Sequence, residues 1–242
     1  MLRIGIVVFP GSNCDKDVYQ ILSSFQNVRV EFIWYTKDKL QVYDAIVIPG
    51  GFAYGDRLRA GIIAAHSPVI TEIKKLAVQG IPILGICNGF QILVECGLLD
   101  GALMTNRSLR FVCRWTTLKV ENRRTPFTCL FKKNQTIRLP IAHGQGRYVV
   151  NNLVEKRLKR KHQLVMRYFK DDPNGSTYNI AAICNEEGNV MGMMPHPERA
   201  SEGTMPSYDS MDSIDGLTIF KSLIHYLGNG RNDTLTFPYI RA

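Results

Sequence analysis

The sequence lacks the features that mark membrane, secreted and repetitive proteins. None of its apolar runs approaches the roughly 18 residues that a membrane-spanning helix needs. The amino-terminal stretch MLRIGIVVFPGSNCD lacks the small-residue cleavage site of a signal peptide. No internal repeat, low-complexity segment or long linker interrupts the chain. We therefore expect a globular protein of the cytoplasm.

Cysteine occurs six times, but without the spacing of a disulfide framework or a metal site. There is no CxxC pair, and no histidine accompanies a cysteine at metal-ligand spacing. Most of these cysteines are therefore expected to be small core residues, and no metal site is predicted. They are Cys14, Cys87, Cys96, Cys113, Cys129 and Cys184.

The length and composition of the chain favour a single domain, and one segment carries part of its positive charge. The 242 residues, of which 45% are hydrophobic, suit a single domain spanning residues 1–242. The net charge of +9 is concentrated partly in EKRLKRKH, Glu155 to His162. This basic run could attract nucleic acid, acidic lipid or an acidic face of a partner protein. We favour a solvated helix face, and we expect neither a nucleic-acid nor a membrane partner.

The first half of the chain alternates between strand and helix patterns. Apolar, β-branched runs predict strands at residues 2–9, 28–34, 44–48 and 81–86, and residues 17–25 have helical spacing. Runs that are apolar on both faces favour a parallel sheet covered by helices on each side. Such a sheet binds its ligands outside the carboxyl ends of the strands.

From about residue 110 the pattern changes to alternating strands. The segments RFVCRWTTLKVE, TIRLPIAHGQGRYVV and NIAAICNEEGNVMGMM, the last with an EEGN turn, predict antiparallel additions to the same sheet. A helical pattern at residues 213–227 closes the fold. The predicted fold class is α/β, with a mostly parallel central sheet, helices on both faces and antiparallel additions in the C-terminal half.

The loops that follow the predicted parallel strands are rich in glycine. They read PGSNCD, PGGFAYGDRLRAG and CNGF, and they should meet at one edge of the sheet. Glycine allows main-chain N–H groups to approach a ligand closely, so Gly50 and Gly51 are candidates for a main-chain contact with substrate. An ordinary tight turn is the alternative, and PGGF alone does not decide between them.

Cys87 lies where a predicted strand runs directly into a helix that begins at Asn88. The pattern from Gly85 to Gly89, G-x-C-x-G, parallels the G-x-S-x-G nucleophile elbow, in which the nucleophile sits exposed at the strand end. Gly89 would relieve the crowding at such a turn. The N-terminal end of the helix favours a thiolate. We interpret Cys87 as a nucleophile rather than a structural cysteine.

A partner for this thiol is present in MMPHPERA, where His196 and Glu198 are two residues apart. Pro195 and Pro197 are expected to hold the backbone extended, so that both side chains point the same way. His196 would take and return a proton, and Glu198 would orient the imidazole and stabilise its cation.

GICNGFQ together with PHPE on this α/β pattern resembles the class I, or triad, glutamine amidotransferases, which have a flavodoxin-like fold. The longer motifs, among them GGFAYGDRLRAG and PIAHGQGRY, are similar to those of glutaminase subunits from purine biosynthesis. This resemblance implies that Cys87 attacks the carboxamide of L-glutamine, that a γ-glutamyl thioester forms, and that water releases glutamate. The ammonia would pass to a separate synthetase subunit, with a small accessory subunit in the same complex.

The resemblance also implies the remaining site residues. Main-chain N–H groups would form the oxyanion hole, at Asn88 and at Gly50 or Gly51. No cofactor is expected on this chain, since no P-loop is visible and ATP with Mg belongs to the synthetase. Substrate contacts are implied for Gln91, Asn106, Ser108, Phe111 and His143, of which His143 contacts either glutamine or the partner.

The sequence departs from the family pattern at one position, and two alternative functions remain. The family pattern reads PIAHGEGRY, whereas this chain has Gln145 in place of the glutamate, which would alter docking if that charge pairs with the synthetase. Another Cys-His hydrolase, such as a γ-glutamyl hydrolase, would share the triad but not PIAHG. A non-catalytic binding module would not need all three triad residues.

Overall fold

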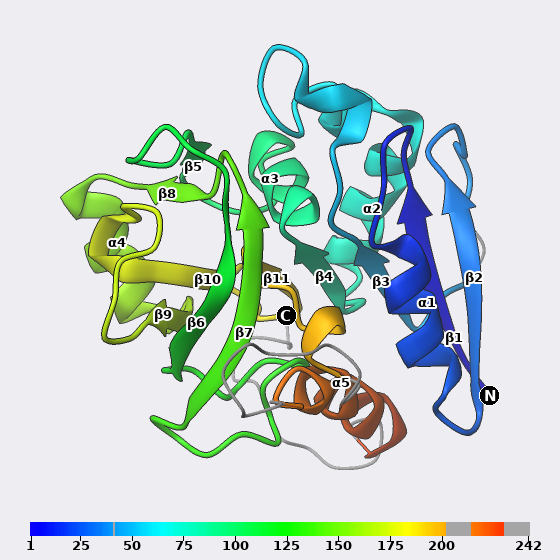
Figure 1. Ribbon diagram of the computed structural model, residues 1–242. Helices are drawn as coiled ribbons and strands as arrows, with labels where there is room; N and C mark the ends of the chain where they lie inside the picture. Colours follow the sequence, from blue (N-terminus) through cyan, green and yellow to red (C-terminus); the bar gives the residue numbers. More distant parts are fainter. Residues whose placement is uncertain (41, 202–213, 230–242) are drawn as a thin grey trace.

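The computed structural model describes residues 1–40, 42–201 and 214–229, and its elements are shown in Figure 1. The first half contains β1 (Leu2–Val8), α1 (Asp15–Ser23), β2 (Val28–Trp34), β3 (Ala45–Ile48), α2 (Pro68–Val78), β4 (Ile83–Ile86) and α3 (Asn88–Glu95). The second half contains β5 (Ala102–Met104), β6 (Val112–Val120), β7 (Thr136–His143), β8 (Arg147–Val149), α4 (Asn152–Arg160), β9 (Leu164–Tyr168), β10 (Ile180–Cys184), β11 (Val190–Met193) and α5 (Leu217–Asn229). Short 3-10 helices are η1 (Ala53–Asp56), η2 (Ala64–His66), η3 (Thr177–Asn179) and η4 (Glu198–Ala200).

A nine-stranded sheet in the order β2-β1-β3-β4-β11-β10-β9-β6-β7 forms the centre of the molecule. The strands from β2 to β11 in this order are parallel, and the rest of the sheet continues antiparallel. The units β1-α1-β2 and β3-α2-β4 step along the sheet in opposite directions. Right-handed crossovers therefore place α1 and α2 on opposite faces. The predicted fold class is confirmed.

Two details of the second half differ from the sequence prediction. β8 was expected to extend the main sheet, but it pairs with β5 in a separate two-stranded sheet. β11 pairs antiparallel with β10, as the EEGN turn predicted, yet it also pairs parallel with β4. Apolar alternation identifies a strand but not its neighbour, so the pattern alone could not assign these pairings.

The C-terminal helix prediction is only partly covered by the structure. Its counterpart is α5, whereas residue 213, where the pattern began, lies outside the described residues. Most of the tail after Gly228, to which no role was assigned, lies outside them as well.

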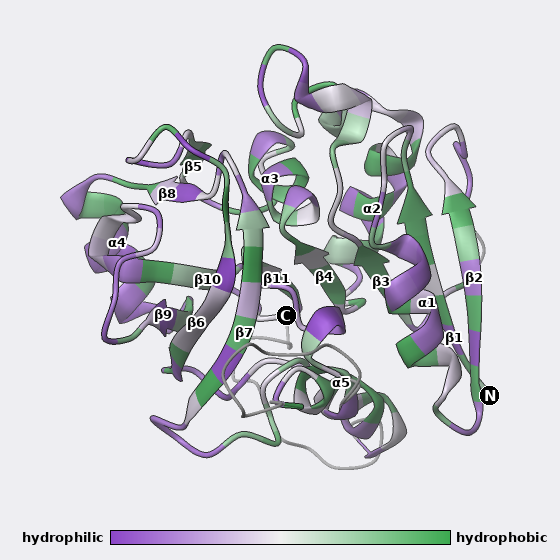
Figure 2. Cartoon of the chain, in the orientation of Figure 1, coloured by the Kyte–Doolittle hydropathy of each residue, from purple (hydrophilic) through white to green (hydrophobic). Residues whose placement is uncertain are grey.

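The core is continuous along the sheet. β3 is hydrophobic throughout (Figure 2), and all of its residues are fully buried because helices cover both faces. Four of the six cysteines are buried, Cys129 is half-buried and Cys113 is exposed. In the ranges that the structure describes, no helix combines the length and the hydrophobicity needed to cross a membrane.

The basic run forms most of α4, a helix capped by Asn151, whose side chain accepts a hydrogen bond from the N–H of Val154 at 2.9 Å. Three of its cations form ion pairs within the chain, which agrees with a solvated helix face. The pairs are Arg157 with Asp100 at 2.7 Å, Lys159 with Glu155 at 2.7 Å and Lys161 with Glu186 at 2.5 Å.

The curvature of the sheet brings distant loops to one place. β4 and β11 are parallel, with Ile86 opposite Met193, so both chains leave the sheet at the same edge. The edge strand β7 passes in front of β11 in Figure 1 and reaches this point. There the carbonyl of Pro140 accepts from the N–H of His196 at 2.8 Å, and the carbonyl of Ala142 lies 3.7 Å from the sulfur of Cys87.

Candidate active site

Cys87 occupies the seam between β4 and α3 with φ 51° and ψ −103°, a conformation that residues other than glycine rarely adopt. Strain at a single residue is typical of a nucleophile elbow. A Cβ at Gly89 would lie 2.0 Å from the carbonyl oxygen of Ile48, and one at Gly85 would lie 2.7 Å from the carbonyl oxygen of Gly89. The two glycines therefore let α3 pack directly on the strands and hold Cys87 at the tip of the turn.

Gly89→Ala should destabilise the elbow strongly. The new methyl group would meet main chain, which cannot move aside as a flexible side chain does. We expect the free energy of unfolding to fall by about 3 kcal/mol, measured by chemical denaturation. Gly228→Ala is the matched control, because a Cβ added at that position would have no atom within 4 Å. Equal stability of the two variants would contradict the packing argument.

His196 follows β11 and forms a close pair with Glu198. Its Nδ1 lies 2.6 Å from Oε1 of the carboxylate. The extended backbone predicted around Pro197 is wrong, because Pro197 has φ −67° and ψ −31° and caps the 3-10 helix η4. Proline suits this position, since its fixed φ matches the first turn of a helix. The two side chains thus meet across a tight turn rather than along an extended segment.

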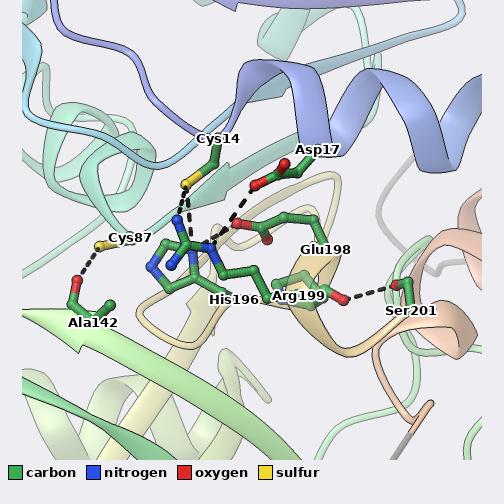
Figure 3. Close-up of polar contacts among 9 residues, drawn as sticks. Cys14, Asp17, Cys87, Ala142, His196, Glu198, Arg199 and Ser201 are labelled. Carbon is green, nitrogen blue, oxygen red and sulfur yellow. Dashed lines mark hydrogen bonds and ion pairs between the residues drawn. The ribbon is translucent and has the colours of Figure 1, made fainter. Parts of the chain in front are cut away.

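The ring of His196 is buried, and Cys87 lies beside it, with its sulfur directed toward the carbonyl of Ala142 (Figure 3). Burial alone would lower the pKa of the imidazole, but the carboxylate of Glu198 and the sulfur of Cys87 outweigh burial and raise the pKa well above its ordinary value. The imidazolium form is therefore favoured at neutral pH. An imidazolium beside a cysteine can both stabilise a thiolate and donate a proton to a leaving group.

A second cysteine, Cys14, lies against the same pair and was not singled out from the sequence. Its Sγ is 3.8 Å from Nδ1 of His196, and it accepts a hydrogen bond from Nη2 of Arg199 at 3.3 Å (Figure 3). Cys14 was grouped with the core cysteines because thiols are commonly buried. The only signal that could have found it was its place in PGSNCD, a loop at the end of a parallel strand.

The predicted oxyanion donors lie in two loops that touch each other. The side-chain oxygen of Asn88 accepts from the N–H of Ala53 at 3.1 Å, which joins the start of α3 to the Gly50–Gly51 loop. Gly51 has φ 154°, and a Cβ there would lie 2.7 Å from the carbonyl oxygen of Gly11. Within the described residues, the main-chain N–H groups of Gly51 and Asn88 find no acceptor. Their role as oxyanion donors stays a prediction.

Two of the predicted glutamine contacts, Gln91 and Asn106, are buried and bonded within the protein. Nε2 of Gln91 donates to the carbonyl of Gln145 at 2.7 Å. Nδ2 of Asn106 donates to the carbonyl of His143 at 2.8 Å, and its Oδ1 accepts from the N–H of Gly146 at 3.0 Å. These bonds fix the loop after β7, so both side chains shape the site whether or not they touch glutamine.

Ser108 and Phe111, by contrast, are exposed in the segment before β6. The ring of Phe111 lies 6.3 Å from that of Phe52, in the loop after β3. Two exposed aromatic rings therefore connect the loops of the two halves of the sheet. The contacts of Ser108 and Phe111 with glutamine stay predictions.

His143, from the end of β7, is buried, and its Nε2 has no hydrogen-bond partner among the described residues. Burial and the nearby charge of His196 lower the pKa of His143 to about 4, so the ring is neutral at physiological pH. Gln145 follows in the same loop, and its side-chain oxygen accepts from the N–H of Ala60 at 3.3 Å. The amide at position 145 thus ties this loop to the segment that follows η1.

Comparison with known proteins defines the class first. The family model of the CobB/CobQ-like glutamine amidotransferase domain matches residues 1–227. The fold and this match define a glutamine amidotransferase domain.

Closer relatives narrow the assignment. The chain is 48% identical to phosphoribosylformylglycinamidine synthase subunit PurQ of Alkaliphilus metalliredigens over 232 residues, 96% of this chain and 100% of the relative. It is 47% identical to the same subunit of Moorella thermoacetica, covering 88% of this chain and 94% of that one. A chain in the structure of PurLQS from Thermotoga maritima aligns with a TM-score of 0.82 at 47% identity, covering 93% of this chain and 99% of that one. The chain therefore belongs to the family of the PurQ subunit of phosphoribosylformylglycinamidine synthase.

Proposed function

We propose that this chain is the glutaminase subunit of phosphoribosylformylglycinamidine synthase. It hydrolyses L-glutamine and supplies ammonia to a separate synthetase subunit, which converts formylglycinamide ribonucleotide to formylglycinamidine ribonucleotide in purine biosynthesis. One observation carries the proposal: a strained cysteine at a strand–helix elbow lies beside a buried imidazole that is paired with a carboxylate at 2.6 Å. Family membership supports the choice of substrate.

The site has the groups needed for acyl transfer. The thiolate of Cys87 attacks the carboxamide carbon of glutamine, and the N–H groups of Gly51 and Asn88 stabilise the developing oxyanion. The imidazolium of His196 protonates the departing ammonia, and a γ-glutamyl thioester remains. Neutral His196 then takes a proton from water, which attacks the thioester and releases glutamate. Glu198 stabilises the cation in each cycle.

The synthesis step belongs to other subunits. The description of the Thermotoga maritima relative as PurLQS supports a complex of this chain with the synthetase and a small accessory subunit. We propose that ATP and Mg bind the synthetase, that this chain carries no cofactor, and that the complex works in the cytoplasm. The side-chain amide of Gln145 is engaged with Ala60 of the same chain.

The coupling between subunits provides the test of this function. We expect the chain alone to release ammonia from glutamine slowly, and the rate to rise when the synthetase, the accessory subunit, ATP and the ribonucleotide are added. The measurement is steady-state ammonia release with and without the partners. An equally high rate without partners would favour an independent γ-glutamyl hydrolase, and failure of a glutamine-analogue electrophile to label Cys87 would favour a non-catalytic binding module.

A further inference from the structure

Cys14 places a second sulfur beside the imidazole of His196, at the nitrogen that the carboxylate also contacts. Sγ of Cys14 is 3.8 Å from Nδ1, and Oε1 of Glu198 is 2.6 Å from the same atom. The ligand atoms of the three residues lie within 4.8 Å of one another, and all three side chains are buried. A thiolate, an imidazole and a carboxylate form a donor set typical of zinc.

An independent observation points to a ligand at this place. The second carboxylate oxygen of Glu198, Oε2, is buried and has no hydrogen-bond partner among the described residues, although the residue is only 4% exposed. A buried carboxylate oxygen without a partner is costly. A cation that both oxygens of the carboxylate coordinate would satisfy it.

We propose that Cys14, His196 and Glu198 form a zinc site, and that bound Zn²⁺ switches off the glutaminase. The switch rests on the proposed function, whereas the site itself does not. Magnesium and calcium prefer sets of oxygen ligands, so they should not compete.

The distances need little rearrangement to hold the ion. With Zn–S near 2.3 Å and Zn–N near 2.0 Å, tetrahedral geometry requires a sulfur-to-nitrogen separation of about 3.5 Å. The observed separation is 3.8 Å. The contact between Nδ1 and Oε1, now 2.6 Å, would have to open to about 3.3 Å. A solvent molecule would complete the coordination shell.

Neighbouring main chain leaves room for the cluster. A Cβ at Gly50 would lie 2.7 Å from Cε1 of His196 and 3.3 Å from Sγ of Cys14, so a glycine is needed beside them. The guanidinium of Arg199 donates a hydrogen bond to the same sulfur. On binding, Zn²⁺ replaces the thiol proton of Cys14 and the proton on Nδ1, and both protons pass to solvent.

Metal at Nδ1 would remove the acid–base function of His196. The ring would become neutral, with its remaining proton on Nε2 and its Nδ1 lone pair on the metal, so it could not accept a further proton. The sulfur of Cys87 would then lack both its base and the acid for the leaving ammonia.

Cobalt tests the site without any assay of activity. Co²⁺ is added to the Cys87→Ala protein, in which the proposed nucleophile cannot bind metal, and the thiolate-to-cobalt charge-transfer absorption is recorded. We expect the band in Cys87→Ala and its loss when Cys14→Ala or the size-matched Cys14→Ser is added. Matched controls in the same background are Cys96→Ala, a buried cysteine, and Cys113→Ser, an exposed one, and both should keep the band. Absence of the band in Cys87→Ala, or its survival without Cys14, would overturn the site.

Zinc affinity and activity complete the test. Competition with a chromophoric chelator should show that Cys14→Ser weakens Zn²⁺ binding to Cys87→Ala by about 100-fold or more. In the complex with its partners, zinc should inhibit the protein carrying native Cys87 and Cys14, a chelator should restore activity, and Cys14→Ser should need correspondingly more zinc. Equal inhibition with and without Cys14 would overturn the switch. If the metal-free complex released no ammonia, the proposed function would fail, while the cobalt band would still report the site.

Discussion

Cys87→Ala should lower kcat for glutamine hydrolysis by about 10⁴-fold or more, because it removes the sulfur that accepts the γ-glutamyl moiety. The sulfur is held by backbone geometry rather than by its own contacts: φ of 51° at the elbow, and a weak contact with the carbonyl of Ala142 at 3.7 Å. Its replacement by a methyl group should therefore leave the fold intact. Steady-state ammonia release, compared at equal thermal stability, is the measurement.

A complementation assay separates loss of chemistry from loss of docking. In the complex, the Cys87→Ala protein should still support synthesis when ammonium salts replace glutamine, since the synthetase needs only ammonia. The matched control is Cys96→Ala, which removes a buried thiol at the C-terminal cap of α3, whose Sγ contacts the carbonyl of Leu93 at 3.4 Å. Cys96→Ala should keep normal glutamine turnover. Residual hydrolysis of more than a few per cent in Cys87→Ala would remove the nucleophile assignment.

The sequence alone predicted the nucleophile elbow because the residue pattern that defines it is local. Gly85, Cys87 and Gly89 all lie in the turn between the strand and the helix. A side chain in place of either glycine would clash with main-chain atoms at this junction. The parallel strands could be predicted from the sequence equally well, since burial on both faces makes them continuously apolar.

Pairings between distant segments could not be predicted from the sequence in the same way. The parallel pairing of β11 with β4 brings His196 to Cys87, but it depends on how the whole sheet closes. Cys14 was missed for the same reason, because its contact with His196 spans 182 positions of the chain. The prediction of an extended backbone at Pro197 was wrong for a different reason. The fixed φ of proline is compatible with both an extended strand and the first turn of a helix, so a proline does not distinguish the two conformations.

Glu198→Gln should lower kcat by about 10³- to 10⁴-fold, the effect expected when the orienting carboxylate of a triad becomes a neutral amide. The amide can still accept a hydrogen bond from Nδ1, so the ring should keep its place at this 2.6 Å contact. What is lost is the negative charge that stabilises the imidazolium. Glu198→Asp keeps the charge and should recover part of the activity, which a purely structural role would not predict.

The pH profile distinguishes loss of charge from loss of shape. Burial acts to lower the pKa of His196, and Glu198 and Cys87 together raise it well above its ordinary value. The imidazolium is thus present at neutral pH and is lost only as the pH rises through the raised pKa. Removing the carboxylate charge lets burial lower the pKa, so the alkaline limb of the kcat profile should move to lower pH in Glu198→Gln. A reduced kcat with an unshifted alkaline limb would mean that Glu198 acts by packing alone.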